Sequence, residues 1–155
     1  MSFSAASVIL RDERALVVID AERGGRIARL VIDGNDRLRG PEHSRSGWAQ
    51  WGSYPLVPWS NRVPGGVIEF EGTVIEVPVN FPDEMAIHGL AADTEWSIDD
   101  HDERSATLSV ELSVSRYHVR AEQRFELDDG ELRQNLAVTN LADWRVPVGL
   151  GIHPW

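Results

Sequence analysis

The 155-residue sequence predicts an all-β protein built of antiparallel sheet. Two observations lead to this prediction. Apolar and polar residues alternate along most segments, which is typical of strands with one face in a core and the other in solvent. No segment shows a convincing helical period. The length is that of one domain with enough chain to bury a core, so we interpret residues 1–155 as a single domain.

The first half of the chain alternates in short segments that turn sequences separate. Three short strands are expected, divided by the turns DERA and AERGG: about 7–11, 15–20 and 26–32. A loop-rich segment then extends from Gly34 to about Gly52. The sequence GVIEFEGTVIEVPVN predicts a hairpin with its turn at Glu71–Gly72. The next segment, FPDEMAIHGLAADTEW, is interpreted as irregular.

Longer alternating segments dominate the second half. The segment 105–114 places its apolar residues on one face: Ala106, Leu108, Val110, Leu112 and Val114. The next segment does the same and carries charges of both signs on its other face: Val119, Ala121, Phe125 and Leu127 point inward. After the hairpin turn DDG, a third strand is expected with Leu132, Leu136 and Val138 inward.

The last segment, RVPVGLGIHPW, is predicted as one more strand. Its expected faces are Val146, Val148, Leu150 and Ile152 on one side, and Pro147, Gly149, Gly151 and His153 on the other. Glycine inside a strand often marks the close approach of a ligand or of another backbone. Two interpretations stay open: the glycines clear a shallow floor for a ligand beneath His153, or they let a neighbouring element pack closely against a core histidine.

Composition excludes several classes of function. The net charge of -10 disfavours nucleic acid as a partner, because phosphate binding needs a basic face. Without cysteine there is no disulfide or thiolate, and all 15 basic residues are arginine, which rules out Schiff-base chemistry. No histidine pair has metal-ligand spacing, so we expect no zinc site. The absence of a long apolar run or signal peptide predicts a cytoplasmic protein without membrane contact.

The candidate site residues lie in irregular segments. His88 follows an apolar pair and His153 follows the glycines, whereas His43, His101 and His118 are expected in solvated positions. The stretch YPLVPWSNRVPGG, residues 54–66, is neither a helix nor an ordinary strand, and it holds Trp59, Asn61 and Arg62 in a proline-rich frame. Aromatic rings stack on the C–H faces of sugars, while Arg, Asn and His bind hydroxyls. These residues favour a neutral polyhydroxylated ligand.

At these residues the sequence resembles the aldose 1-epimerase (galactose mutarotase) family. The matching pieces are YPLVPWSNRVPGGVIEFEG, AIHGLAADTEW and YHVRAEQRFELDDGELRQNLAVTNLADWRVPVGLGIHPW, and the resemblance runs from about residue 10 to the end. It implies a sandwich of long antiparallel sheets, the supersandwich, here incomplete. It also implies an isomerase that interconverts the α and β anomers of a free hexose such as glucose or galactose, with no cofactor.

The resemblance also implies roles for individual residues. Arg62 would bind sugar hydroxyls, with Asn61 and Trp59 beside it. His88 would contact and polarise the sugar, and His153 would act as the general acid that protonates the ring oxygen. Some relatives act on phosphorylated sugars, for which Arg45 or Arg116 could serve; the sequence does not choose between these substrates.

One part of the family pattern has no counterpart. The family's glutamate base and a sugar-binding aspartate follow the His-Pro motif, whereas this sequence stops at Trp155 and so resembles an N-terminal half. Two copies could complete each other, another polypeptide could supply the remainder, or the chain could be a truncated product. Two other functions therefore stay open: a non-catalytic carbohydrate-binding module, and a structural fragment that needs a partner chain.

Overall fold

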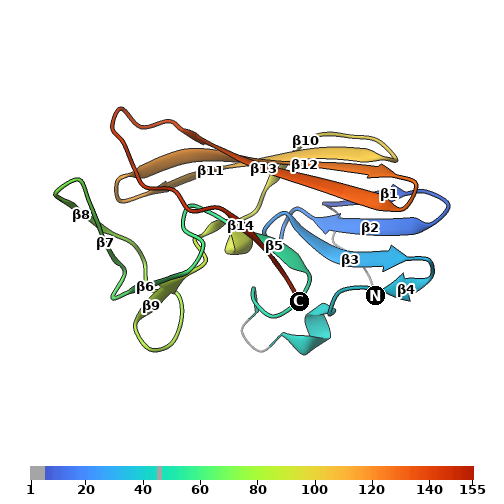
Figure 1. The fold of residues 1–155 in the computed structure, drawn as a ribbon, viewed down its shortest axis with the longest axis horizontal. Helices are drawn as coiled ribbons and strands as arrows, with labels where there is room; N and C mark the ends of the chain where they lie inside the picture. The colour runs from blue at the N-terminus through green and yellow to red at the C-terminus, as the bar shows by residue number, and fades with distance from the viewer. Residues whose placement is uncertain (1–5, 45–46) are drawn as a thin grey trace.

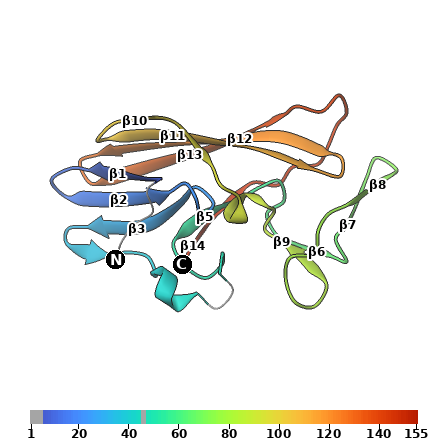
Figure 2. The ribbon, with the colours of Figure 1, turned by 180° about the vertical axis from the view of Figure 1, so that it is seen from behind.

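The computed structural model describes residues 6–44 and 47–155, which form two antiparallel sheets packed face to face (Figures 1 and 2). The predicted all-β sandwich is confirmed. The first sheet has the strand order β1-β2-β3-β5-β14, and β4 pairs with β3 beside this path. Its strands are β1 (Ser7–Arg11), β2 (Ala15–Asp20), β3 (Arg26–Ile32), β4 (Asn35–Asp36), β5 (Ser53–Leu56) and β14 (Gly151–Pro154).

The second sheet is made of the long alternating segments and has the order β10-β11-β12-β13. Its strands are β10 (Ser97–His101), β11 (Ser105–Val114), β12 (Tyr117–Asp128) and β13 (Glu131–Asn140). Four short strands form two separate pairs: β6 (Arg62–Pro64) pairs with β9 (Met85–Ile87), and the hairpin of β7 (Val67–Phe70) and β8 (Thr73–Glu76) lies between them in the sequence. Two 3₁₀ turns, η1 (Pro41–His43) and η2 (Ala91–Asp93), complete the described elements.

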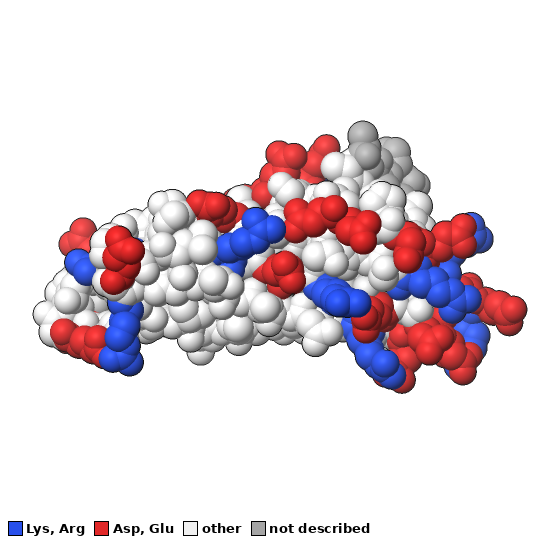
Figure 3. Space-filling view, turned by 90° about the horizontal axis from the view of Figure 1, so that it is seen from above, with Lys and Arg blue, Asp and Glu red and all other residues white. Residues whose placement is uncertain are grey.

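The core lies between the two sheets, as the alternation of apolar and polar residues in the sequence predicts. Leu10, Val17 and Ile19 of the first sheet belong to the same buried cluster as Leu108 and Phe125 of the second. The opposite face of β12 is solvated, and its charges are paired locally: Arg120 with Asp99, and Arg124 with Glu126. On the face seen from above, arginine side chains lie among Asp and Glu and do not gather into a basic patch (Figure 3).

The last predicted strand is only partly correct. Residues 141–150 cross from the second sheet to the first outside any strand, and only Gly151–Pro154 forms β14 (Figure 1). Its expected apolar face is not buried, because within the described residues no layer covers it: Val148, Leu150 and Ile152 are 42%, 44% and 38% exposed. Among the described strands β14 pairs with β5 alone and β13 with β12 alone, so each sheet has an open edge on this side.

Three smaller predictions also need correction. The stretch 54–66 is not free of strands, since β5 and β6 both lie within or across it. His101 is exposed as predicted, but it ends strand β10 and does not sit in a turn. Gly149 and Gly151 do not clear a floor: an added Cβ would lie 3.0 Å from Ser60 Oγ and 3.0 Å from Leu56 Cδ1. The interpretation in which the glycines allow close packing is therefore the correct one.

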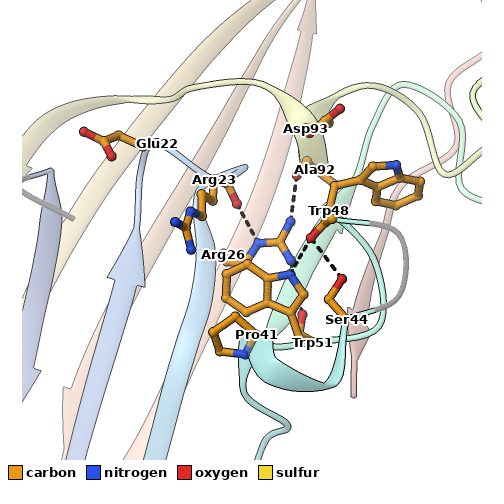
Figure 4. Close-up of a pocket in the computed structure, with 10 residues that line it drawn as sticks. Glu22, Arg23, Arg26, Pro41, Ser44, Trp48, Trp51, Ala92 and Asp93 are labelled. Atoms are coloured by element: carbon orange, nitrogen blue, oxygen red, sulfur yellow. Dashed lines mark hydrogen bonds between the residues drawn. The ribbon is translucent and has the colours of Figure 1, made fainter. Parts of the chain in front are cut away.

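Arg26 is a fully buried cation that ties three segments together. Its guanidinium donates to the backbone carbonyls of Arg23 (2.6 Å), Trp51 (3.2 Å) and Ala92 (2.8 Å), and it lies 4.1 Å from the centroid of the Trp51 ring (Figure 4). Burial lowers the pKa of Arg26 to about 10, so the side chain stays charged at neutral pH. The loop before β5 and the η2 segment are thus anchored to the start of β3.

Replacing this cation should destabilise the fold strongly. In Arg26→Met, three carbonyls lose their charged donor in a buried site, and we expect a loss of about 3 kcal/mol in the free energy of unfolding, measured by urea denaturation. Arg145→Met is the matched control, because the Arg145 side chain is 79% exposed and its contacts, with Glu71 and with the Phe70 ring 6.0 Å away, lie at the surface; we expect a change below about 1 kcal/mol. Equal effects in both variants would contradict the anchoring role.

Candidate active site

The pairing of β14 with β5 places the first candidate residue, His153. The two strands are antiparallel, and His153 lies opposite Tyr54 in the register. On a pleated sheet, directly opposed residues present their side chains to the same face. His153 therefore reaches the face of the first sheet that already carries Tyr54, about 100 positions earlier in the sequence.

His153 is held inside an aromatic stack. Its ring stacks with that of Trp155 (centroids 5.0 Å apart, planes at 4°) and with that of Tyr54 (5.3 Å, 25°). Trp155 Nε1 donates to the Tyr54 hydroxyl at 3.1 Å, which links the two outer rings, and Trp48 contacts the edge of Tyr54. These contacts restrain the orientation of the imidazole ring.

The second candidate, His88, is positioned by backbone contacts of two loops. Its φ of 60° is in the left-handed region, which is uncommon for residues other than glycine. Its backbone N–H donates to the carbonyl of Asn61 (3.1 Å), and its Nδ1 lies 3.1 Å from the carbonyl of Ser60. The next residue, Gly89, packs so closely on Val57 that an added Cβ would lie 1.9 Å from the Val57 carbonyl oxygen. These contacts hold the backbone of His88 and Gly89 against the segment 57–62.

The fold brings the two histidines together. The centroids of the His88 and His153 rings are 5.1 Å apart, with the planes at 68°. Arg62, at the start of β6, is opposite Ile87 of β9, and its side chain is exposed over the ring of Phe81. Its positive charge is close enough to help lower the pKa of His88. The two imidazoles and the guanidinium therefore share one region of the surface.

Two other predicted contacts occupy different environments. Asn61 is exposed beside Arg62, so its side chain is free to meet a ligand. Trp59 is only 5% exposed and packs in the core beside Tyr117, with ring centroids 6.1 Å apart. The structure shows that Trp59 packs in the core. The contact of Trp59 with a sugar stays a prediction.

The remaining candidates bear on substrate charge and on metals. Arg45 lies outside the described residues, and Arg116 stacks on Trp144 with its Cζ 4.8 Å from the ring centroid.

Within residues 6–44 and 47–155, no group of three or more His, Cys, Asp and Glu side chains is arranged to hold a metal ion. Over the same residues, no helix is long and apolar enough to cross a membrane.

The pKa of His88 is shifted by its surroundings. Burial lowers it below the ordinary 6.5, the Ser60 carbonyl opposes this, and the positive charges of His153 and Arg62 lower it further. Asp83, Glu84 and Asp93, the nearest acidic residues in the sequence, are all exposed. His88 is therefore favoured as a neutral imidazole at pH 7.

Sequence reasoning missed Tyr54 and Asn80 as parts of this arrangement. Tyr54 was visible within the proline-rich stretch, but its place against His153 depends on a long-range strand pairing. The Asn80 side chain donates to the carbonyls of Ile87 (3.0 Å) and Gly89 (3.2 Å) and accepts from the Ile87 N–H (2.7 Å). It thereby fixes the backbone on both sides of His88.

Comparison with known proteins identifies the family. The sequence model described as aldose 1-epimerase matches residues 6–155. The chain belongs to the aldose 1-epimerase family. It is 33% identical over 137 residues to the uncharacterized Escherichia coli K12 protein YphB, a match that covers 87% of this chain and 47% of YphB.

Solved structures show the same fold. The crystal structure of an E. coli K12 protein provisionally assigned as an aldose 1-epimerase aligns with a TM-score of 0.86 and 29% identity, over 96% of this chain and 51% of that one. A galactose mutarotase-like protein from Clostridium acetobutylicum aligns with a TM-score of 0.83 at 18% identity, over 96% and 49% of the two chains. The chain thus spans about half the length of the relatives it matches.

The close contact at Gly89 gives a prediction about the site's backbone. Gly89→Ala combines a positive φ of 74° with a clash against the Val57 carbonyl, and we expect it to cost about 3 kcal/mol or more in the free energy of unfolding. Gly72→Ala is the matched control, because Gly72 has the same φ of 74° and nothing within 4 Å of an added Cβ. Its expected cost is about 1 kcal/mol. Similar urea midpoints for the two variants would contradict a destabilising clash between residue 89 and the Val57 carbonyl.

The lowered pKa of His88 predicts how stability depends on pH. The unfolded chain protonates His88 near pH 6.5 and the folded chain only at lower pH, so the folded state binds fewer protons between these values. The free energy of unfolding should be highest above pH 6.5 and fall as the pH drops from 6.5 through the folded pKa. Urea unfolding at pH 7.5 and 5.5 measures this fall, which His88→Asn should reduce and the exposed-site variant His101→Gln should leave unchanged.

Proposed function

We propose that this chain carries the sugar-binding and acid–base residues of an aldose 1-epimerase acting on a free hexose such as glucose or galactose. The observation that supports this most directly is the pairing of His88 and His153 beside Arg62 and an aromatic stack. Family membership supports a sugar ligand and an isomerase. The identity of the hexose, and the catalytic activity itself, belong to the proposal.

The proposed reaction needs only proton movements. A proton leaves the anomeric hydroxyl and one reaches the ring oxygen, so that the ring opens, the C1–C2 bond rotates and the ring closes on the other face. His153 would serve the ring oxygen, and His88 would contact the sugar from the adjacent side. Arg62 would bind hydroxyls through its planar fork of donors, and Trp155 or Tyr54 would bound the site with an aromatic face.

The free edge of β14 is relevant to the question of which further chain completes the site. The neutral segment 146–155 exposes Val148, Leu150 and Ile152 beside the free edge of β14, and relatives of twice the length have further chain to place there. We propose that added strands cover this edge. A second copy of the chain and a separate polypeptide are both compatible with it, and light scattering on the purified chain distinguishes the two.

Polarimetry tests the proposed activity. Freshly dissolved α-glucose or α-galactose should lose its excess optical rotation faster with the protein than in buffer. His153→Ala should slow this catalysis by about 100-fold or more, the usual contribution of a positioned acid–base group. His118→Ala is the control, since His118 is a surface residue paired with Glu111. A decay at the buffer rate with both sugars would refute the proposal for these substrates.

A non-catalytic sugar-binding module is the second candidate. It is favoured by one observation: Asp83, Glu84 and Asp93, the acidic residues nearest to His88 in the sequence, are all exposed. Quenching of tryptophan fluorescence by glucose or galactose, without any faster change in optical rotation, would support this alternative over the isomerase. Trp155 and Trp48 lie in the stack and would report such binding.

A further inference from the structure

The backbone around His88 is held by a side chain to which the proposed function gives no part. Asn80 is half-buried and precedes the turn 82–84. Its Oδ1 accepts from the Ile87 N–H at 2.7 Å, and its Nδ2 donates to the carbonyls of Ile87 (3.0 Å) and Gly89 (3.2 Å). Because a backbone N–H only donates and a carbonyl only accepts, these three bonds also fix which end of the amide is oxygen.

The amide of Asn80 takes the place of a neighbouring strand. It bonds to both the N–H and the carbonyl of Ile87, as a residue of an antiparallel partner strand does in a hydrogen-bonded pair. Ile87 also lies opposite Arg62 in the pairing of β9 with β6. The end of β9 is therefore restrained by a strand and by a side chain, directly before His88.

A single NH₂ group binds the carbonyls of the residues on both sides of His88. The carbonyls of Ile87 and Gly89 must then point toward the same nitrogen, which restricts the backbone between them. His88 has a φ of 60° there, in a region that residues other than glycine occupy only where their surroundings impose it. Asn80 imposes this conformation together with the close packing of Gly89 on Val57.

The position of the imidazole follows from this backbone conformation. In it, Nδ1 of His88 lies 3.1 Å from the Ser60 carbonyl, and the ring centroid lies 5.1 Å from that of His153. A carbonyl only accepts hydrogen bonds, so the contact with Ser60 requires the proton on Nδ1. With a negative φ the side chain of His88 would leave the backbone in a different direction, and both contacts would be lost.

The residue that follows Asn80 supports another part of the site. The guanidinium of Arg62 lies over the ring of Phe81, with Cζ 5.5 Å from the ring centroid. The N–H groups of Asn80 and Phe81 both donate to the carbonyl of Met85, at 3.2 and 3.1 Å, which ties the two residues to the start of β9. Adjacent residues thus support His88 through its backbone and Arg62 through its side chain.

We propose that Asn80 is a positioning residue of the site, because it sets the backbone conformation that directs the His88 imidazole toward the sugar. Phe81 does the same for the guanidinium of Arg62. These roles rest on the proposed function, in which His88 and Arg62 contact the substrate, and they require no particular proton transfer by His88. Asn80 itself does not touch the sugar. A misplacement of about 1 Å caused by a remote change can cost about 100-fold in rate, so loss of this support should be measurable.

Replacement of the amide tests the proposal without any need for activity. Asn80→Ala removes all three hydrogen bonds. Asn140→Ala is the matched control, because the Asn140 amide also binds a backbone carbonyl, that of Trp144 (2.7 Å), and a backbone N–H, that of Ala142 (3.1 Å). In ¹H–¹⁵N spectra of ¹⁵N-histidine-labelled protein at pH 7.5, His88 should be a single Nδ1–H form in the unmodified chain and the control, and averaged tautomers in Asn80→Ala.

Two further variants keep the test decisive if Asn80→Ala does not fold. Asn80→Asp keeps an oxygen for the Ile87 N–H and loses both donors, and we expect the same averaging at His88. Phe81→Leu leaves the hydrogen bonds intact and removes the aromatic face beneath the guanidinium, so the Kd for glucose or galactose, from tryptophan quenching, should rise by about two- to fivefold. A single Nδ1–H form of His88 in the folded Asn80 variants would overturn the positioning role.

Phe70→Leu is the matched control for Phe81→Leu. The Phe70 ring lies under the guanidinium of Arg145, 6.0 Å from its centroid, in the hairpin of β7 and β8. We expect this variant to leave the Kd for the sugar unchanged. Equal rises of the Kd in Phe70→Leu and Phe81→Leu would overturn the role of Phe81.

Catalysis separates a positioning role from a role in stability alone. In Asn80→Ala we expect kcat/KM for the loss of optical rotation to fall by about 10- to 100-fold, while the urea midpoint stays close to that of Asn140→Ala. An unchanged kcat/KM would overturn the proposal and leave the mutarotase function intact. If the unmodified chain neither binds sugar nor speeds the change in optical rotation, the proposed function fails and the role toward a sugar with it. The spectra then still decide whether Asn80 holds His88.

Discussion

The antiparallel pairing of β14 with β5 is the contact on which the rest of the site depends. It joins Gly151–Pro154 to Ser53–Leu56 and so closes a loop of about 100 residues. Closing so long a loop has an entropic cost that local contacts cannot offset, which means that the rest of the sandwich must already favour it. Gly149 N–H, bonded to the carbonyl of Pro58 at 2.9 Å, and the Trp155 N–H, bonded to that of Gly52 at 3.0 Å, secure the pairing on both sides.

The other half of the site depends on backbone contacts that tolerate little change. The carbonyl of Val57 accepts from the N–H groups of Leu90 (2.8 Å) and Ala91 (3.2 Å), and Gly89 lies directly on it. His88 takes its left-handed conformation between these contacts. Such a conformation costs free energy and persists only where the surroundings over-determine it. The imidazole is therefore held by the backbone of the segment 57–62, and its orientation does not depend on a long flexible side chain.

The sequence predicted what alternation can reveal and missed what long-range pairing decides. The bounds of β1, β2 and β3 and the turn at Glu71–Gly72 were foreseen, because period two and turn residues are local signals. The family motifs pointed to His88 and His153, which the structure brings together. The last strand was overextended, since its alternation is real but no layer covers Val148 and Leu150 here. Tyr54 begins the proline-rich stretch, but no local signal indicated its role, which depends on the pairing of β14 with β5.

Different kinds of contact hold the two histidines in place, so the two imidazole rings have different chemical surroundings. His88 is fixed by a hydrogen bond to a carbonyl, which dictates where its proton sits. His153 is fixed by stacking with Trp155 and with Tyr54, which restrains the ring without providing, within the described residues, a partner for Nδ1. The centroids of the two rings are nonetheless only 5.1 Å apart, so one ligand can contact both imidazoles. The contacts around each ring set its orientation, and for His88 they also set which nitrogen is protonated.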